Sequence, residues 1–98
     1  MQTTKEQMSE YLSKAQTLQR MAMGIADVSI STSLVCGGET SLTVYVFPLD
    51  EKNNFIPDVK VKGNYLYHRY YFAEWEYAET NEKALKDMLV YQRELLDL

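Results

Sequence analysis

The spacing of the apolar residues changes twice along the chain, and this change limits the folds that the chain can adopt. From Met8 to Ile25, apolar side chains recur every three or four residues, as on one face of a helix. From Val28 they recur at every second position, as in a strand with one buried face. The helical spacing returns from Leu85 to Leu96. The pattern predicts a helix, a sheet and a second helix, in that order.

The first helix has signals at both of its ends. Thr3 or Thr4 can cap its beginning, because Glu6 or Gln7 lies three residues further on and can complete a capping box. Gly24 suits its end, since glycine adopts the left-handed conformation that often follows a last helical turn at no steric cost. We therefore expect a long amphipathic helix at the start of the chain.

The second helix closes the chain. Thr80 or Asn81 can cap its beginning, and Glu82 then lies near the positive end of the helix dipole. The residues expected to face the core are Leu85, Met88, Leu89, Gln92, Leu95 and Leu96.

A β-hairpin is predicted between the first helix and Pro48. Gly37-Gly38 supplies the positive φ angles of a tight turn, and proline ends the second strand because it has no N–H for the ladder. Turn-forming residues fill positions 50–58, which are expected to make a surface connection. The face toward the helices should hold Val28, Ile30, Leu34, Leu42, Val44 and Val46, and the opposite face Ser29, Ser31, Ser33, Thr43, Tyr45 and Phe47.

The segment from Val59 to Tyr77 is rich in residues that favour strands. We predict one long, bent strand with a bulge at Gly63. The alternative is that Gly63-Asn64 is a hairpin turn, which would give a fourth strand. The predicted fold is one α+β domain spanning residues 1–98, with an antiparallel sheet of three strands, or of four in the alternative, and both helices on one face of it.

Composition weighs against several kinds of partner and site. Of the 98 residues, 14 are Asp or Glu and 10 are Lys or Arg, and the net charge of -4 disfavours a polyanion as the main partner. One histidine, His68, and one cysteine, Cys36, do not make a transition-metal site, so we expect no metal and no cofactor. The beginning of the chain does not resemble a signal peptide, and no apolar stretch approaches about 20 residues, so we expect a cytoplasmic protein without a membrane span.

Two sets of residues are the only candidates for catalysis. Cys36 with His68 is one. However, the position beside a Gly-Gly turn is ordinarily occupied by a small, partly buried residue, and a free cysteine is usually such a structural residue. His68, Glu74 and Glu76 are the other, because they share one face of a regular strand and such a row can transfer protons. A row on an open sheet forms no pocket, so we expect the protein not to be an enzyme.

The aromatic residues are concentrated in one part of the sequence. Seven of the 12 lie between Tyr65 and Tyr77, so some must point to each face of the sheet and a one-sided core cannot hold them all. Tyr, Trp and Arg are enriched at the energetic centres of protein interfaces. We therefore predict a surface that binds another protein or a second copy of the chain, formed by Tyr45, Phe47, Tyr65, Tyr67, Arg69, Tyr71 and Trp75.

Nucleic acid is the alternative partner for the same surface. Single strands stack on aromatic rings, and Lys60, Lys62 and Arg69 are the nearest cations. The order of helix, three strands and helix is similar to the double-stranded RNA-binding fold, but the second helix lacks the lysine cluster which that family places on phosphates. In size and charge the chain is also similar to secretion chaperones and to inhibitor or immunity proteins, which bind other proteins.

Overall fold

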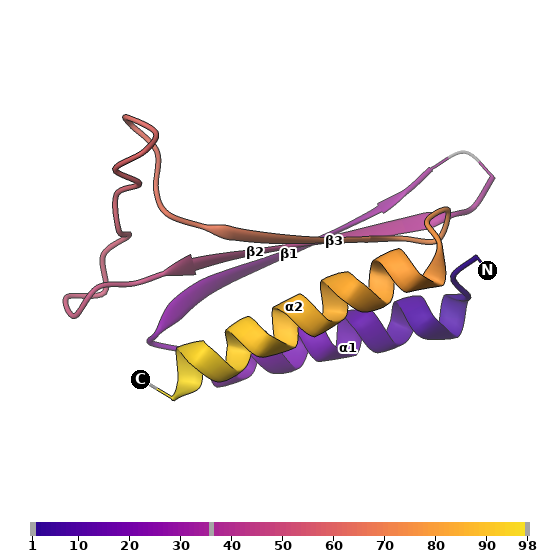
Figure 1. Ribbon diagram of the computed structural model, residues 1–98, viewed down its shortest axis with the longest axis horizontal. Helices are drawn as coiled ribbons and strands as arrows, with labels where there is room; N and C mark the ends of the chain where they lie inside the picture. Colours follow the sequence, from indigo (N-terminus) through magenta and orange to yellow (C-terminus); the bar gives the residue numbers. More distant parts are fainter. Residues whose placement is uncertain (1, 36, 98) are drawn as a thin grey trace.

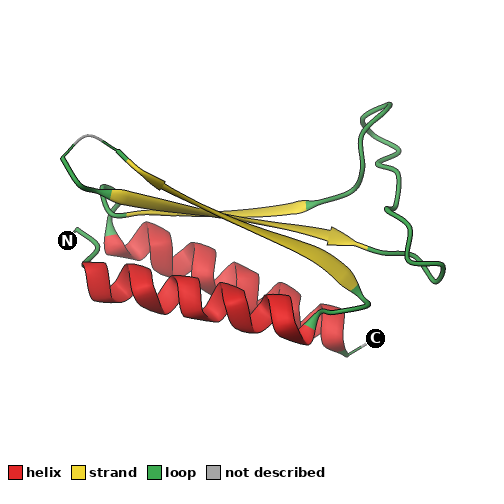
Figure 2. Cartoon of the chain, turned by 180° about the vertical axis from the view of Figure 1, so that it is seen from behind, coloured by secondary structure: helices red, strands yellow, loops and turns green. Residues whose placement is uncertain are grey.

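The computed structural model describes residues 2–35 and 37–97. The elements follow the order α1 (Lys5–Met21), β1 (Ala26–Leu34), β2 (Thr40–Pro48), β3 (His68–Ala73) and α2 (Ala78–Leu96). The strands form one antiparallel sheet in the order β1-β2-β3, and both helices lie along the same face of it (Figure 1). Residues 49–67, which we call the arm, first continue beyond the end of the sheet and then rise on the side away from the helices (Figure 2). The predicted α+β fold is confirmed.

The helix α1 begins as its sequence predicts. Thr4 is the N-cap, its hydroxyl accepts from the Gln7 N–H at 3.1 Å, and the Gln7 side chain accepts from the Thr4 N–H at 2.8 Å. The helix ends at Met21, and Gly24 has the expected positive φ, at 84°, in the turn that leads to β1. A local signal at each end is therefore enough to place this helix.

The core lies between the two helices and the face of the sheet that they cover. The ring of Tyr11 in α1 stacks on that of Phe72 in β3, with centroids 4.8 Å apart, and its hydroxyl donates to Glu82 in α2 at 2.8 Å. One residue thus joins three elements. The other fully or nearly fully buried apolar side chains include Met8, Ala15, Leu18, Val28, Leu42, Val44, Val46, Leu85, Met88 and Leu95. Each large side chain among them contributes about 1.5–3 kcal/mol by leaving water.

The far end of the hairpin departs from the predicted burial. Leu34 lies on the helix-facing side of β1 but is 72% exposed, and Ile30 is only half-buried. Figure 1 shows the reason: the twist of the paired strands carries the hairpin end away from α1. The prediction that Leu34 lies under the helices is therefore wrong, although its face is the predicted one.

The prediction of one long third strand is also wrong. β3 contains only His68–Ala73, and residues 59–63 form turns, with Gly63 at a φ of 91°. Strand β2 pairs with β3 from Ser41↔Ala73 to Val46↔His68, and Pro48 and the turn after it offer no further partner. A fourth strand is not formed either among the described residues, because Pro57 and Tyr65 make a single isolated bridge.

The beginning of α2 differs from the prediction as well. The helix starts at Ala78 with Tyr77 as its N-cap, so Thr80 and Asn81 lie inside its first turn. Asn81 is fully buried and pairs with the outer edge of β3: its Oδ1 accepts from the Ala73 N–H at 3.2 Å, and its Nδ2 donates to the Ala73 carbonyl at 2.8 Å. The same Nδ2 donates to the Thr3 hydroxyl at 2.5 Å. The asparagine amide therefore makes the two hydrogen bonds to Ala73 that a neighbouring strand would otherwise make.

We predict that Asn81→Ala lowers the free energy of unfolding by about 1–3 kcal/mol, because it leaves the buried N–H and carbonyl of Ala73 without partners. Thr80→Ala is the matched control, since Thr80 is exposed and its change should stay within about 0.5 kcal/mol. Urea unfolding followed by circular dichroism measures both. Equal losses in the two variants would contradict this role of Asn81.

Candidate binding surface

The strand register decides which aromatic residues reach the face without helices. Tyr45 lies opposite Arg69, Thr43 lies opposite Tyr71, and Phe47 lies opposite Asp27. These positions share the open face, as predicted for β1 and β2. His68, Tyr70 and Phe72 alternate with them and point toward the helices.

Five aromatic rings form a connected set of contacts where the arm meets the open face of the sheet, which is the face without helices. We call them the aromatic cluster: Tyr45, Phe47, Phe55, Tyr65 and Tyr67. Phe47 lies at the centre, with centroid distances of 6.4 Å to Tyr45 and 5.7 Å to Tyr67, and the Tyr45 and Tyr67 rings are 5.9 Å apart. Phe55 links Phe47, at 5.7 Å, to Tyr65, at 5.1 Å. All these distances lie within the range in which aromatic pairs attract each other.

Turns within the arm bring Phe55 and Tyr65 to the sheet. The Asp50 carboxylate accepts from the N–H groups of Lys52 and Asn54, at 2.8 and 2.9 Å, and closes the first turn. Isolated bridges then pair Leu49 with Phe55 and Pro57 with Tyr65. The chain is thereby folded back so that residues from both halves of the arm reach Phe47.

The cluster is only partly shielded from water. Tyr65 is 50% exposed, Tyr67 49% and Phe55 40%, whereas Tyr45 and Phe47 are half-buried beneath them. The arm adds Val59, which is 95% exposed. Apolar side chains gathered in this way mark binding surfaces more often than scattered ones do.

The structure brings four of the seven predicted residues into this cluster: Tyr45, Phe47, Tyr65 and Tyr67. Arg69 and Tyr71 lie beside it on β3, where the guanidinium of Arg69 stands 5.1 Å from the centroid of the Tyr71 ring. Trp75 follows the end of β3 and stacks on none of these rings among the described residues. It therefore lies apart from the cluster.

Phe55 was missed by sequence reasoning. It lies within positions 50–58, which are otherwise typical of a polar surface connection. A large aromatic residue between two turn segments was the available signal, because such a ring gains little from full exposure and usually packs against something.

The proposed catalytic row does not form among the described residues. His68 opens β3 and its ring stacks on Tyr91 of α2, with centroids 3.8 Å apart. Glu74 follows the other end of β3, where its carboxylate accepts from the Thr40 N–H at 2.6 Å and pairs with Lys5 at 3.1 Å. Glu76 makes no side-chain hydrogen bond in the part of the chain that the structure describes. Cys36 lies outside the described residues.

Of the residues considered for catalysis, His68 and Glu74 have shifted pKa values with clear causes. Partial burial lowers the pKa of His68 from its ordinary 6.5, and the nearby Glu94 carboxylate opposes this. For Glu74, the hydrogen bonds from the Thr40 N–H and hydroxyl, together with Lys5, hold the pKa below its usual 4.5. Both groups therefore connect stability to pH.

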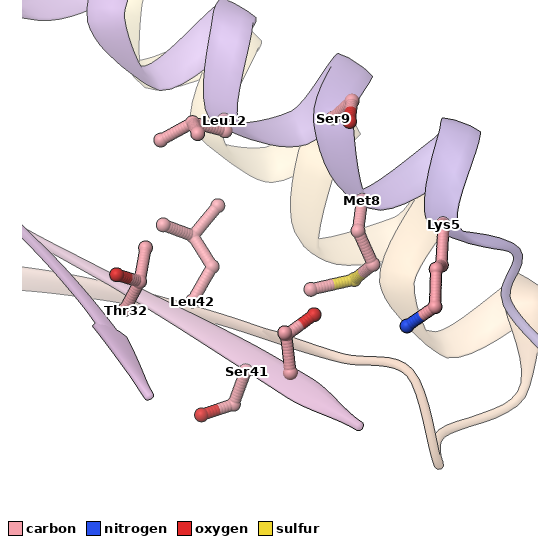
Figure 3. A pocket seen from close by; sticks show the side chains of 8 residues that line it. Lys5, Met8, Ser9, Leu12, Thr32, Ser41 and Leu42 are labelled. Atoms are coloured by element: carbon pink, nitrogen blue, oxygen red, sulfur yellow. The ribbon is translucent and has the colours of Figure 1, made fainter. Parts of the chain in front are cut away.

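A small concave site lies on the helix side of the hairpin, below its diverging end. It has a volume of about 270 Å³, and Met8 and Leu12 of α1 face Thr32 and Leu42 across it (Figure 3). The lining is mainly apolar, with Lys5 at its border. Since Lys5 is already paired with Glu74, no unpartnered charge points into it.

Comparison of the chain with known protein families, with curated proteins and with solved structures finds no match. Within residues 2–35 and 37–97, no three His, Cys, Asp or Glu side chains are arranged to hold a metal ion. Neither helix in this part of the chain is long and apolar enough to cross a bilayer.

We predict that stability falls as the pH drops below about 6.5, because the unfolded state then binds a proton at His68 that the folded state resists. The loss ends below the lowered pKa of the folded state. His68→Phe keeps a ring against Tyr91 and should flatten this part of the profile. Urea unfolding at a series of pH values measures it, and an unchanged slope in the variant would contradict the assignment.

A second prediction concerns Glu74 at lower pH. Its folded pKa is depressed, so its contribution to stability is present above about pH 4.5 and is lost as the pH falls through the folded value. Glu74→Gln should therefore be less stable than the wild type at neutral pH and should converge with it in acid. Glu76→Gln serves as the control and should follow the wild type throughout. Parallel profiles for Glu74→Gln and the wild type would exclude this linkage.

Proposed function

We propose that this protein is a non-enzymatic interaction domain that binds a different protein through the aromatic cluster. The observation that carries the proposal is the set of five rings in mutual contact on the sheet face that no helix covers. Such rings already have much of their conformational freedom removed by their neighbours, so a partner that buries them gains apolar area at low entropic cost.

The position of the cluster supports binding of a surface and not of a small molecule. Its rings lie along the open face and the arm, whereas ligand sites for small molecules are enclosed and concave. The phenolic hydroxyl groups of Tyr65 and Tyr67 supply polar handles beside the apolar rings. Arg69 and Tyr71 extend the same face toward the middle of the sheet.

Charge favours a protein partner over nucleic acid. The chain carries a net charge of -4; Arg69 is the one Lys or Arg within β3, and the arm carries Lys52, Lys60 and Lys62. Non-specific affinity for nucleic acid depends on several Lys or Arg side chains that displace counterions from phosphates. The arrangement therefore suits a partner that contributes apolar side chains and a few hydrogen bonds.

Photo-cross-linking can identify the partner. A photoreactive phenylalanine analogue in place of Tyr65 would cross-link the protein that covers the cluster in cells. With the purified partner, we predict that Tyr67→Ala weakens binding by about 2 kcal/mol or more, roughly thirtyfold in Kd, because Tyr67 contacts both Tyr45 and Phe47.

Tyr77→Ala is the control, because its side chain is 66% exposed and lies outside the cluster. Equal weakening by both variants would contradict the proposal. Tight, salt-sensitive binding of a single-stranded oligonucleotide that Tyr67→Ala abolishes would replace it with nucleic-acid binding. Conversion of a dimer to a monomer by Tyr67→Ala, seen in sedimentation, would identify the partner of this face as a second copy of the chain.

A further inference from the structure

The outer edge of β1 directs backbone groups away from the sheet. In an antiparallel ladder, successive residues alternate between bonding to the neighbouring strand and pointing outward. The Val35 N–H donates to the Glu39 carbonyl and the Leu49 N–H to the Ile25 carbonyl, so the odd-numbered residues of this register bond toward β2. The outward N–H and carbonyl groups therefore belong to Ala26, Val28, Ile30, Thr32 and Leu34.

The helix α1 closes the first part of this edge. The Ala26 N–H donates to the Ala22 carbonyl at 2.9 Å, and the Gln19 side chain donates to the Val28 carbonyl at 2.9 Å. Among the described residues, no comparable partner reaches the outward groups of Ile30, Thr32 or Leu34. These three alternate positions form what we call the open edge.

The other edge of the sheet has protection that the open edge lacks. Strand β3 is shorter, Asn81 pairs with its last residue, and Arg69 places a charge on it. Proteins commonly use short strands, charges, prolines or covering elements to stop sheet edges from pairing with other chains. The stretch from Val28 to Val35 contains no charged residue and no proline.

Side chains at the open edge also leave apolar surface uncovered. Leu34 is 72% exposed, Ile30 is half-buried, and both lie on the helix-facing side of β1. The concave site bordered by Thr32, Met8 and Leu42 lies on this same side (Figure 3). The opposite side of β1 carries only small serines here, so nothing bulky blocks the approach of another strand.

We propose that a second copy of the chain pairs antiparallel with the open edge of β1, about a two-fold axis at Thr32. In this register Thr32 faces Thr32 of the second copy, and Ile30 faces Leu34 of the second copy. In this register each of the three residues with unpaired outward backbone groups faces another such residue of the second copy. Each facing pair can then exchange two backbone hydrogen bonds. The sheet then has six strands, with the helices of both copies on one side.

The register is self-complementary in its side chains. Ile30 and Leu34 become neighbours across the new strand pair, at the roughly 5 Å separation at which such residues stabilise a sheet. A slip of one residue would set each outward N–H and carbonyl opposite a residue that already bonds to β2, and these contacts would be lost. Asp27, the charged residue of β1, lies outside the paired stretch, so the carboxylates of the two copies stay apart.

This pairing does not depend on the function proposed for the aromatic cluster. The cluster lies on β2 and the arm, on the face opposite the helices, and a partner strand at β1 leaves it uncovered. The dimer would present two clusters on the same side of one continuous sheet.

Disulfide trapping tests the register directly. In a Cys36→Ser background, Thr32→Cys should form a disulfide-linked dimer under mild oxidation, because facing residues of a hydrogen-bonded pair have Cα atoms about 5.5 Å apart, within disulfide range. Ser29→Cys is the matched control on the same strand. Its copies would lie roughly 20 Å apart along the paired strands and should remain unlinked.

Sedimentation of the untagged protein gives the second readout. We predict a dimer in the micromolar range and a dimer Kd raised about tenfold or more by Thr32→Pro, since proline removes an outward N–H that β2 does not use. Tyr67→Ala should leave the dimer intact, which separates this proposal from the one for the aromatic cluster. A wild type that stays monomeric to millimolar concentration, or Thr32→Cys linking no faster than Ser29→Cys, would overturn the pairing.

Discussion

The alternation of side chains along β2 is the constraint on which the rest of the structure depends. β2 is the central strand and pairs with both neighbours, so its register sets theirs. Burial of Leu42, Val44 and Val46 against the helices fixes that register, because a slip of one residue would move all three to the other face. The same burial places Tyr45 and Phe47 on the face without helices, where the aromatic cluster forms.

The helices do more than cover one face of this sheet. From α1, Gln19 closes the outer edge of β1 at Val28, and from α2, Asn81 closes the outer edge of β3 at Ala73. Both amides replace part of a missing strand and satisfy backbone groups that would otherwise need water or another chain. Among the described residues, the two helices leave uncovered one face of the sheet and the β1 edge from Ile30 to Leu34, which lie on different parts of the molecule.

Local signals predicted the parts of the fold that depend on a few adjacent residues. The capping box at Thr4, the glycine turn after α1 and the two faces of the hairpin are of this kind. The prediction of a long third strand was wrong because β propensity depends on pairing with a neighbouring strand, and the ladder between β2 and β3 ends at Val46↔His68. Asn81 was misread as a cap because its buried amide bonds to Ala73 and Thr3, contacts that no local pattern encodes.

The sequence by itself determined the order of helices and strands and the residues that share each face of the hairpin, because periods of 3.6 and 2 are properties of the local chain. Only the tertiary structure decided where β3 begins and ends, how the arm returns, and that Phe55 joins Phe47 and Tyr65 in one cluster. It also decided which part of the β1 edge stays open. These features depend on which distant residues meet, and such contacts arise when the core residues of helices and sheet are buried together.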